Sequence, residues 1–166
     1  MSLILCPTRG GQSSIPNQQW AISLAKERNA ALTFLYISNV RFLERASGPM
    51  IVDISDKLDE MGEFLLAMAQ DRAAQADVKA EMIVRQGDFQ DALTAVIQEI
   101  GADTVVIGQA ARGTGVTNES YMTILAGAVK QTGAELFIVD EGQVVHLYSP
   151  ITHTQHDDIN QTQHDT

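Results

Sequence analysis

Cysteine is nearly absent from this chain of 166 residues, because Cys6 is its only one. A single cysteine excludes an internal disulfide and a cysteine-rich metal site. Long apolar runs are absent as well, and no window approaches the roughly 18 consecutive apolar residues that a membrane-spanning helix needs. The amino terminus has no basic region followed by a long apolar one. These absences predict a cytoplasmic protein with no membrane partner.

Basic residues are also few, since 11 lysines and arginines stand against 21 aspartates and glutamates, for a net charge of -10. Such an acidic chain has no general affinity for nucleic acid or anionic membrane, because both require a basic surface. Apolar residues make up 45% of the chain and charged residues only 19%. This composition and length predict one folded domain with a sizeable core.

Segments typical of strands and helices alternate along the chain. The expected strands span 2–6, 31–38, 78–85, 102–108 and 135–139. The expected helices span 15–28, about 53–76, 88–100 and about 118–132. This alternation predicts parallel strands with right-handed crossovers, and therefore an open sheet with helices on both faces. The segment 39–50 has no clear periodicity and is expected to form a loop or a short irregular helix.

The expected body of the domain covers residues 1–140. Residues 141–149 follow as a candidate extra strand, at a sheet edge or a subunit contact, and 150–166 form a polar tail. In the longest helix, apolar residues recur every three or four positions, which predicts a buried stripe and assigns Met61 and Met68 to the core. The stripe consists of Ile54, Leu58, Met61, Leu65 and Met68.

Two glycine-containing segments follow buried strands and are therefore expected at the carboxyl edge of the sheet, where α/β proteins bind ligands. They are ILCPTRGGQS (4–13) and the loop at 108–117. In one interpretation Arg9 and Arg112 converge there on an anion, assisted by backbone amides. In the alternative, Arg9 is solvated or paired with an acidic neighbour, and the glycines only form turns.

The chain resembles the universal stress protein family over roughly residues 2–140. The resemblance rests on ILCP, on AISLAKERNAALTFLYI and on VRQGDFQDALTAVIQEIGADTVVIG. It implies an α/β fold of three layers, with an open, parallel five-stranded sheet in the order 3-2-1-4-5, like the adenine-nucleotide alpha-hydrolases. It also implies a homodimer, with the last core strand and 142–148 at the contact, and a stress-response role that depends on binding rather than catalysis.

One branch of this family binds ATP, and its first motif is proline, any residue, aspartate, glycine. The matching residues here are Pro7, Thr8, Arg9 and Gly10, so arginine replaces the aspartate. The exchange removes an acceptor for ribose hydroxyls and supplies donors suited to an anion.

The second motif of that branch is G-x-x-G, nine residues, then G-[ST]. Gly108 matches its first glycine, but alanine stands at 111 and the next glycine is Gly113. The final pair falls on Met122–Thr123, with Gly127–Ala128 as a rival placement. A methionine there would put a bulky side chain where a phosphate lies. The motif is therefore incomplete.

The predicted function is binding of a small anionic ligand, such as ATP or another adenine nucleotide, at this edge. The alternative is a dimeric interaction protein with a vestigial nucleotide site. We expect no catalytic residues and no metal site, since Asp88 is explained as a helix N-cap and the histidines of the tail have no folded scaffold. The predicted ligand-binding residues are Pro7, Thr8, Arg9, Gly10, Ser38, Asn39, Gly108, Gln109, Arg112, Gly113 and Thr123.

Overall fold

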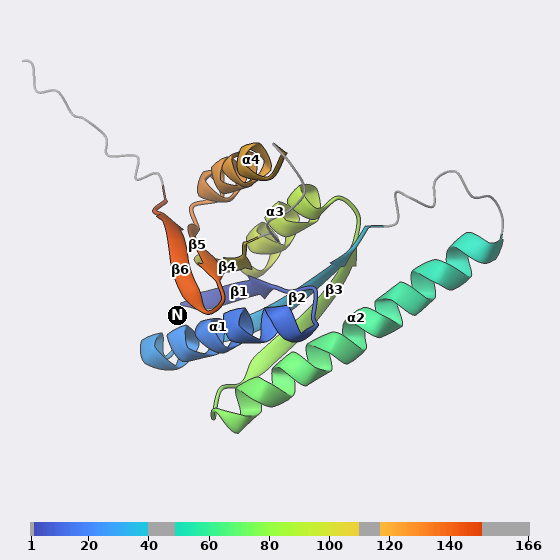
Figure 1. The fold of residues 1–166 in the computed structure, drawn as a ribbon, viewed down its shortest axis with the longest axis horizontal. Coiled ribbons are helices and arrows are strands. Elements are labelled where there is room, and N and C mark those ends of the chain that lie inside the picture. Colours follow the sequence, from blue (N-terminus) through green and yellow to red (C-terminus); the bar gives the residue numbers. More distant parts are fainter. Residues whose placement is uncertain (1, 40–48, 110–116, 151–166) are drawn as a thin grey trace, which may run out of the picture.

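Strands and helices alternate in the computed structural model, which describes residues 2–39, 49–109 and 117–150 (Figure 1). The strands are β1 (Leu3–Pro7), β2 (Ala31–Ser38), β3 (Ala80–Gln86), β4 (Thr104–Gly108), β5 (Glu135–Asp140) and β6 (Gln143–Tyr148). The helices are η1 (Gln12–Ser14, a single 3-10 turn), α1 (Ile15–Arg28), α2 (Pro49–Gln75), α3 (Phe89–Ile100) and α4 (Thr117–Gln131).

All six strands form one sheet in the order β3-β2-β1-β4-β5-β6. The first five are parallel, which confirms the α/β class and the expected order 3-2-1-4-5. The sixth, β6, runs antiparallel to β5 and extends the sheet at that edge. The expected fold is therefore correct, with one antiparallel strand added.

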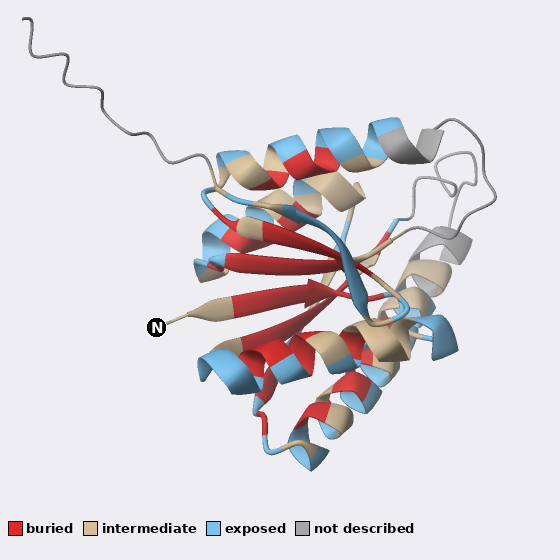
Figure 2. Cartoon of the chain, turned by 60° about the vertical axis from the view of Figure 1, so that its left-hand side comes forward, coloured by how far each residue is buried: buried red, intermediate tan, exposed pale blue. Residues whose placement is uncertain are grey.

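Helices cover both faces of the sheet and create two cores (Figure 2). On one face α1 and α2 pack on side chains such as Ile4 and Phe34, both 0% exposed. On the other face α3 and α4 pack on side chains such as Leu5 and Val105. Both faces of the central strands are buried, which is why these strands are almost entirely apolar in sequence.

Helix α2 differs from its prediction in two respects. It begins at Pro49 rather than near 53, while residues 40–48 of the expected loop lie outside the described residues. Two members of its predicted buried stripe were also assigned wrongly, because Met61 and Met68 are 47% and 42% exposed. The buried residues in the described part of this helix are Gly62, Leu66, Ala69 and Ala73. A Cβ atom at Gly62 would lie 2.4 Å from the Tyr36 ring. The helix therefore approaches the sheet most closely at Gly62, where no side chain would fit.

The ends of α3 are fixed as the sequence predicts. The backbone N–H of Asp91 donates to Asp88 Oδ2 at 3.3 Å, which confirms Asp88 as the N-cap.

Of the tail, 151–166 lie outside the described residues. No helix in the described part of the chain is both long enough and apolar enough to cross a membrane.

Candidate functional site

A cleft opens at the carboxyl ends of the strands, where β1 and β4 lie side by side. These strands pair in parallel, with Leu5 opposite Val105. The chain leaves β1 towards α1 on one face of the sheet and leaves β4 towards α4 on the other. Such a reversal of winding is where α/β sheets bind ligands. The cleft has a volume of about 1410 Å³, which is ample for a small molecule.

Apolar, charged and uncharged polar side chains line this cleft. The apolar ones include residues of the strands and of α3 and α4, namely Leu35, Ile37, Phe89, Ile107, Met122 and Leu125. The charged ones are Arg9 after β1, Asp88 after β3, and Asp140 and Glu141 at the end of β5. Among the lining residues that the structure describes, a single guanidinium is thus accompanied by three carboxylates. The described lining combines apolar surface for a flat ring with the positive charge of Arg9.

The loop after β1 is fixed by helices that lie behind it. Gln18 of α1, which is 1% exposed, donates from Nε2 to Thr8 Oγ1 at 2.8 Å, and Arg72 of α2 donates to Gln18 Oε1 at 2.8 Å. Gly10 has a φ of 73°, and a Cβ atom there would lie 2.6 Å from Leu65 Cδ2. Only glycine fits this backbone and this space without rearrangement. The loop is therefore a rigid part of the fold.

Arg9 lies on this rigid loop, and its side chain is exposed. No described residue accepts a hydrogen bond from its guanidinium. Its charge acts on Tyr121 of α4, whose hydroxyl pKa is raised by burial and by Asp88 and lowered by Arg9. A guanidinium without an acceptor in a cleft can form a two-pronged hydrogen bond with a phosphate or carboxylate.

The end of β4 is closed by contacts within the chain. The Gln109 N–H donates to the Val139 carbonyl at 2.8 Å, so it is not free for a phosphate. The Asn17 amide fills the space beside Gly108, where a Cβ atom would lie 2.7 Å from Asn17 Nδ2. Asn17 Oδ1 in turn accepts from the Gly142 N–H at 3.2 Å. At the described end of β4, residues 108 and 109, the backbone N–H of Gln109 is therefore used by the fold and is not available to a phosphate.

The structure brings together most of the predicted ligand-binding residues that it describes. Seven of them line the cleft, namely Pro7, Thr8, Arg9, Gly10, Asn39, Gly108 and Gln109. Ser38 and Thr123 do not: Ser38 is buried and donates to Asp59 Oδ1 at 3.0 Å, and Thr123 is exposed on α4. Arg112 and Gly113 lie outside the described residues.

Sequence analysis missed several lining residues. Phe89, Asp140 and Glu141 follow the carboxyl ends of β3 and β5, so the rule that placed Arg9 at this edge would have found them too. Tyr121 is different, because it lies within α4 and no motif marks it. Only the packing of α4 on the sheet brings its side chain to the cleft.

Neither thiol chemistry nor a described metal centre is evident near the cleft. Burial raises the pKa of Cys6 to about 12, so its thiol stays protonated at neutral pH and is a poor nucleophile. In residues 2–39, 49–109 and 117–150, no three side chains of His, Cys, Asp or Glu are grouped so that they could hold a metal ion.

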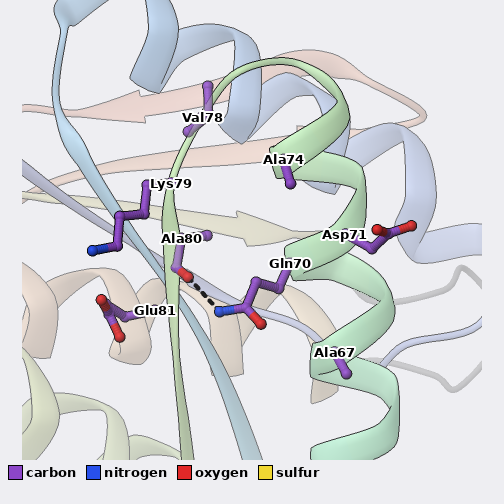
Figure 3. A pocket seen from close by; sticks show the side chains of 8 residues that line it. All are labelled: Ala67, Gln70, Asp71, Ala74, Val78, Lys79, Ala80 and Glu81. Carbon is purple, nitrogen blue, oxygen red and sulfur yellow. Dashed lines mark hydrogen bonds between the residues drawn. The ribbon is translucent and has the colours of Figure 1, made fainter.

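A second hollow, of about 540 Å³, lies between α2 and the start of β3, away from the carboxyl edge (Figure 3). The Gln70 amide spans it and donates to the Ala80 carbonyl at 2.6 Å. Figure 3 shows Asp71 directed away from β3, with Lys79 and Glu81 on the side of β3 away from α2. No set of polar groups converges in this hollow, so the cleft at β1 and β4 is the better candidate site.

Comparisons with known proteins identify the family and the fold. The model of the universal stress protein family matches residues 1–116. Comparison with curated proteins found no match.

Solved structures with a similar fold include universal stress protein UspA from Lactobacillus plantarum, at 14% identity and a TM-score of 0.66, covering 83% of this chain and 97% of that one. A universal stress protein in complex with cAMP has 22% identity and a TM-score of 0.64, covering 84% and 97%. A family member from Arabidopsis thaliana with AMP bound has 13% identity and a TM-score of 0.58, covering 84% and 91%. At these identities the likeness shows the fold.

Proposed function

Since the chain belongs to the universal stress protein family, we propose that it is a cytoplasmic stress-response protein that binds an adenine nucleotide in the cleft between β1 and β4. The observation that carries the proposal is the exposed Arg9 guanidinium on a rigid loop, next to apolar side chains able to receive a base. Structural neighbours with cAMP and with AMP bound support the class of ligand.

A thermal-shift titration of the full chain with AMP, cAMP and inorganic phosphate tests this function. A nucleotide at about 100 times its Kd stabilises the folded state by about 2.7 kcal/mol, which raises the melting temperature measurably. We expect Arg9→Ala to abolish most of this rise. The matched control is Lys79→Ala, which removes an exposed cation near the start of β3, away from the cleft, and should leave the rise unchanged. Absence of a shift with every adenine nucleotide would contradict the proposal.

We further propose that the cleft acts by binding and not by turnover. No described lining residue forms the pair of nucleophile and general base that hydrolysis by side chains requires. Incubation with ATP, followed by chromatographic separation of ATP, ADP and AMP, measures turnover directly. Nucleotide hydrolysis at a rate above that of an Arg9→Ala control would contradict this part of the proposal.

The alternative is a dimeric interaction protein, and β6 is the observation that favours it. β6 is the last strand of the sheet, and Val144, Val145 and Leu147 on it are 42%, 41% and 53% exposed. An exposed apolar edge strand is suited to pairing with another strand. β6 carries no charged residue in a chain with a net charge of -10, so two copies can approach there with the least repulsion.

Sedimentation measurements distinguish this alternative. We propose that two copies pair through β6, so Val145→Lys should convert a dimer into a monomer by placing a charge in the strand pair. Lys79→Ala serves again as a surface control and should remain dimeric. A wild-type chain that stays monomeric at high concentration would contradict the dimer.

A further inference from the structure

We propose that the cleft prefers nucleotides with one phosphate group over di- and triphosphates. This inference rests on the proposed function, because it concerns the ligand of the same site. Two features carry it: the distribution of charged side chains along the carboxyl edge of the sheet, and the use of backbone N–H groups at the described end of β4.

The charges alternate across the strand order. Asp88 follows β3 at one side of the cleft, Arg9 follows β1 in the middle, and Asp140 and Glu141 close β5 at the other side. With one cation and three carboxylates, the described lining carries a net charge of -2. A ligand with a single phosphate can place it at Arg9, between the carboxylates. Each additional phosphate must extend from Arg9 towards a carboxylate, and like charges placed together oppose binding.

The neutral donors point to the same limit. Phosphates beyond the first would lie beside the end of β4, where nucleotide-binding folds usually supply backbone N–H groups. Here the Gln109 N–H is already bonded to the Val139 carbonyl. The Asn17 side chain occupies the space next to Gly108, and its orientation is set by the Gly142 N–H. Among the described residues, this end of the cleft thus offers no free amide at Gln109 to offset the carboxylates.

Met122 adds a steric element. It lines the cleft from α4 and is partly buried. The side chain contributes apolar surface on the side where a polyphosphate chain would need room. An adenine ring gains from such a surface, whereas a phosphate loses solvation against it.

Calorimetric titration of the full chain with adenosine, AMP, ADP and ATP, near neutral pH and without divalent cations, tests the inference. We expect the affinity to be highest at one phosphate: AMP should bind about tenfold more tightly than ATP, with ADP between them. Adenosine should bind more weakly than AMP, because it cannot use Arg9. Raising the salt from about 0.05 to about 0.5 M should reduce the difference between AMP and ATP, since salt screens the repulsion.

The double variant Asp140→Asn with Glu141→Gln removes two of the charges and keeps their shapes. It should bring the affinity for ATP close to that for AMP. The control Asp77→Asn with Glu81→Gln makes the same change in net charge away from the carboxyl edge, at exposed positions beside the start of β3, and should keep the preference. Thermal melting of each variant verifies that it folds.

The outcomes separate the two proposals. ATP that binds the wild-type chain as tightly as AMP, or an unchanged preference in the double variant, overturns the single-phosphate inference and leaves nucleotide binding intact. Failure of all four compounds to bind overturns the proposed function and this inference together.

Discussion

An arginine lies at each end of the sheet, and the two differ in whether the protein supplies acceptors for their hydrogen bonds. At the amino ends of the strands, Arg28 forms an ion pair with Glu135, donates to Thr104 Oγ1 at 3.2 Å and lies 5.5 Å from the centre of the Phe137 ring. At the carboxyl ends, Arg9 lies in an open cleft and no described residue accepts a hydrogen bond from it. The first arginine is fully used by the fold.

The difference shows that the acceptors near an arginine, rather than the residue type, decide whether it stabilises the fold or remains available to a ligand. At the amino end the first residues of β4 and β5 present acceptors to Arg28, so the fold satisfies its own polar groups. At the carboxyl end the chain turns away on opposite faces, and the Arg9 guanidinium has no acceptor among the described residues. A ligand can supply there what the fold does not.

The largest expected effect comes from the loop that carries Arg9. Gly10→Ala should lower the free energy of unfolding by about 3 kcal/mol, because a side chain is strained at positive φ and would also collide with Leu65. Gly11→Ala is the matched control: it has a φ of 82° but open space, so about 1 kcal/mol is expected. Urea denaturation measures both. Equal losses would show that Leu65 does not support the loop.

The Cys6 thiol on β1 tests whether solvent reaches the core beneath the cleft. Burial raises its thiol pKa from an ordinary value of 9.0 to about 12, so the unfolded chain loses this proton first as the pH rises. Stability from this group is therefore complete below about pH 9 and should decrease by about 1.4 kcal/mol per unit between pH 9 and 12. Denaturation from pH 8 to 11, with Cys6→Ala as control, measures the decrease. Equal slopes for the two proteins would mean that solvent reaches the thiol.

The two arginines can be exchanged for alanine to test the comparison itself. Arg28→Ala should lower the free energy of unfolding by about 1 to 2 kcal/mol, since it leaves Glu135 and the buried Thr104 without this donor. Arg9→Ala should change it by less than about 0.5 kcal/mol, because it breaks no described contact. Denaturation curves give both values. Comparable losses would place Arg9 among the structural residues.

The smallest effect concerns Asp88, which serves both the fold and the cleft. Asp88→Ala should cost about 1 kcal/mol through loss of the cap at Asp91. Asp88→Asn should be nearly neutral in thermal melting, because asparagine also caps helices well. A large loss with asparagine would indicate that the charge, rather than the cap, stabilises this end of α3.

Much of the fold could be predicted from sequence because its signals are local. The limits of α1 were predicted as found, since the surrounding strands are short apolar runs and the helix ends in basic residues. The stripe of α2 was not, because hydrophobicity favours Met61 and Met68, whereas close packing on Tyr36 favours Gly62. Periodicity identifies a helix well but does not measure its distance from the sheet.

The candidate site, like the fold, could be predicted in part from the sequence. Arg9, Gly10 and Gly108 were found because they lie at or just after the carboxyl ends of strands, and parallel strands end at the same edge. The position of Tyr121 in the cleft was not predictable, nor was the hydrogen bond from the Gln109 N–H to the Val139 carbonyl. Both depend on how elements that are distant in sequence pack together. The prediction therefore named the edge and its cation but not the charges and bonds that surround them.

The sequence by itself determined the class of fold, the order of the parallel strands and the exchange of a carboxylate for a guanidinium at position 9. These follow from periodicity, residue chemistry and the resemblance to a family, all of which are carried by short segments. The tertiary structure alone decided that three carboxylates line the same cleft as Arg9 and that β6 forms an exposed edge. Charge balance and exposure depend on distances between segments far apart in the chain, and only packing sets those distances.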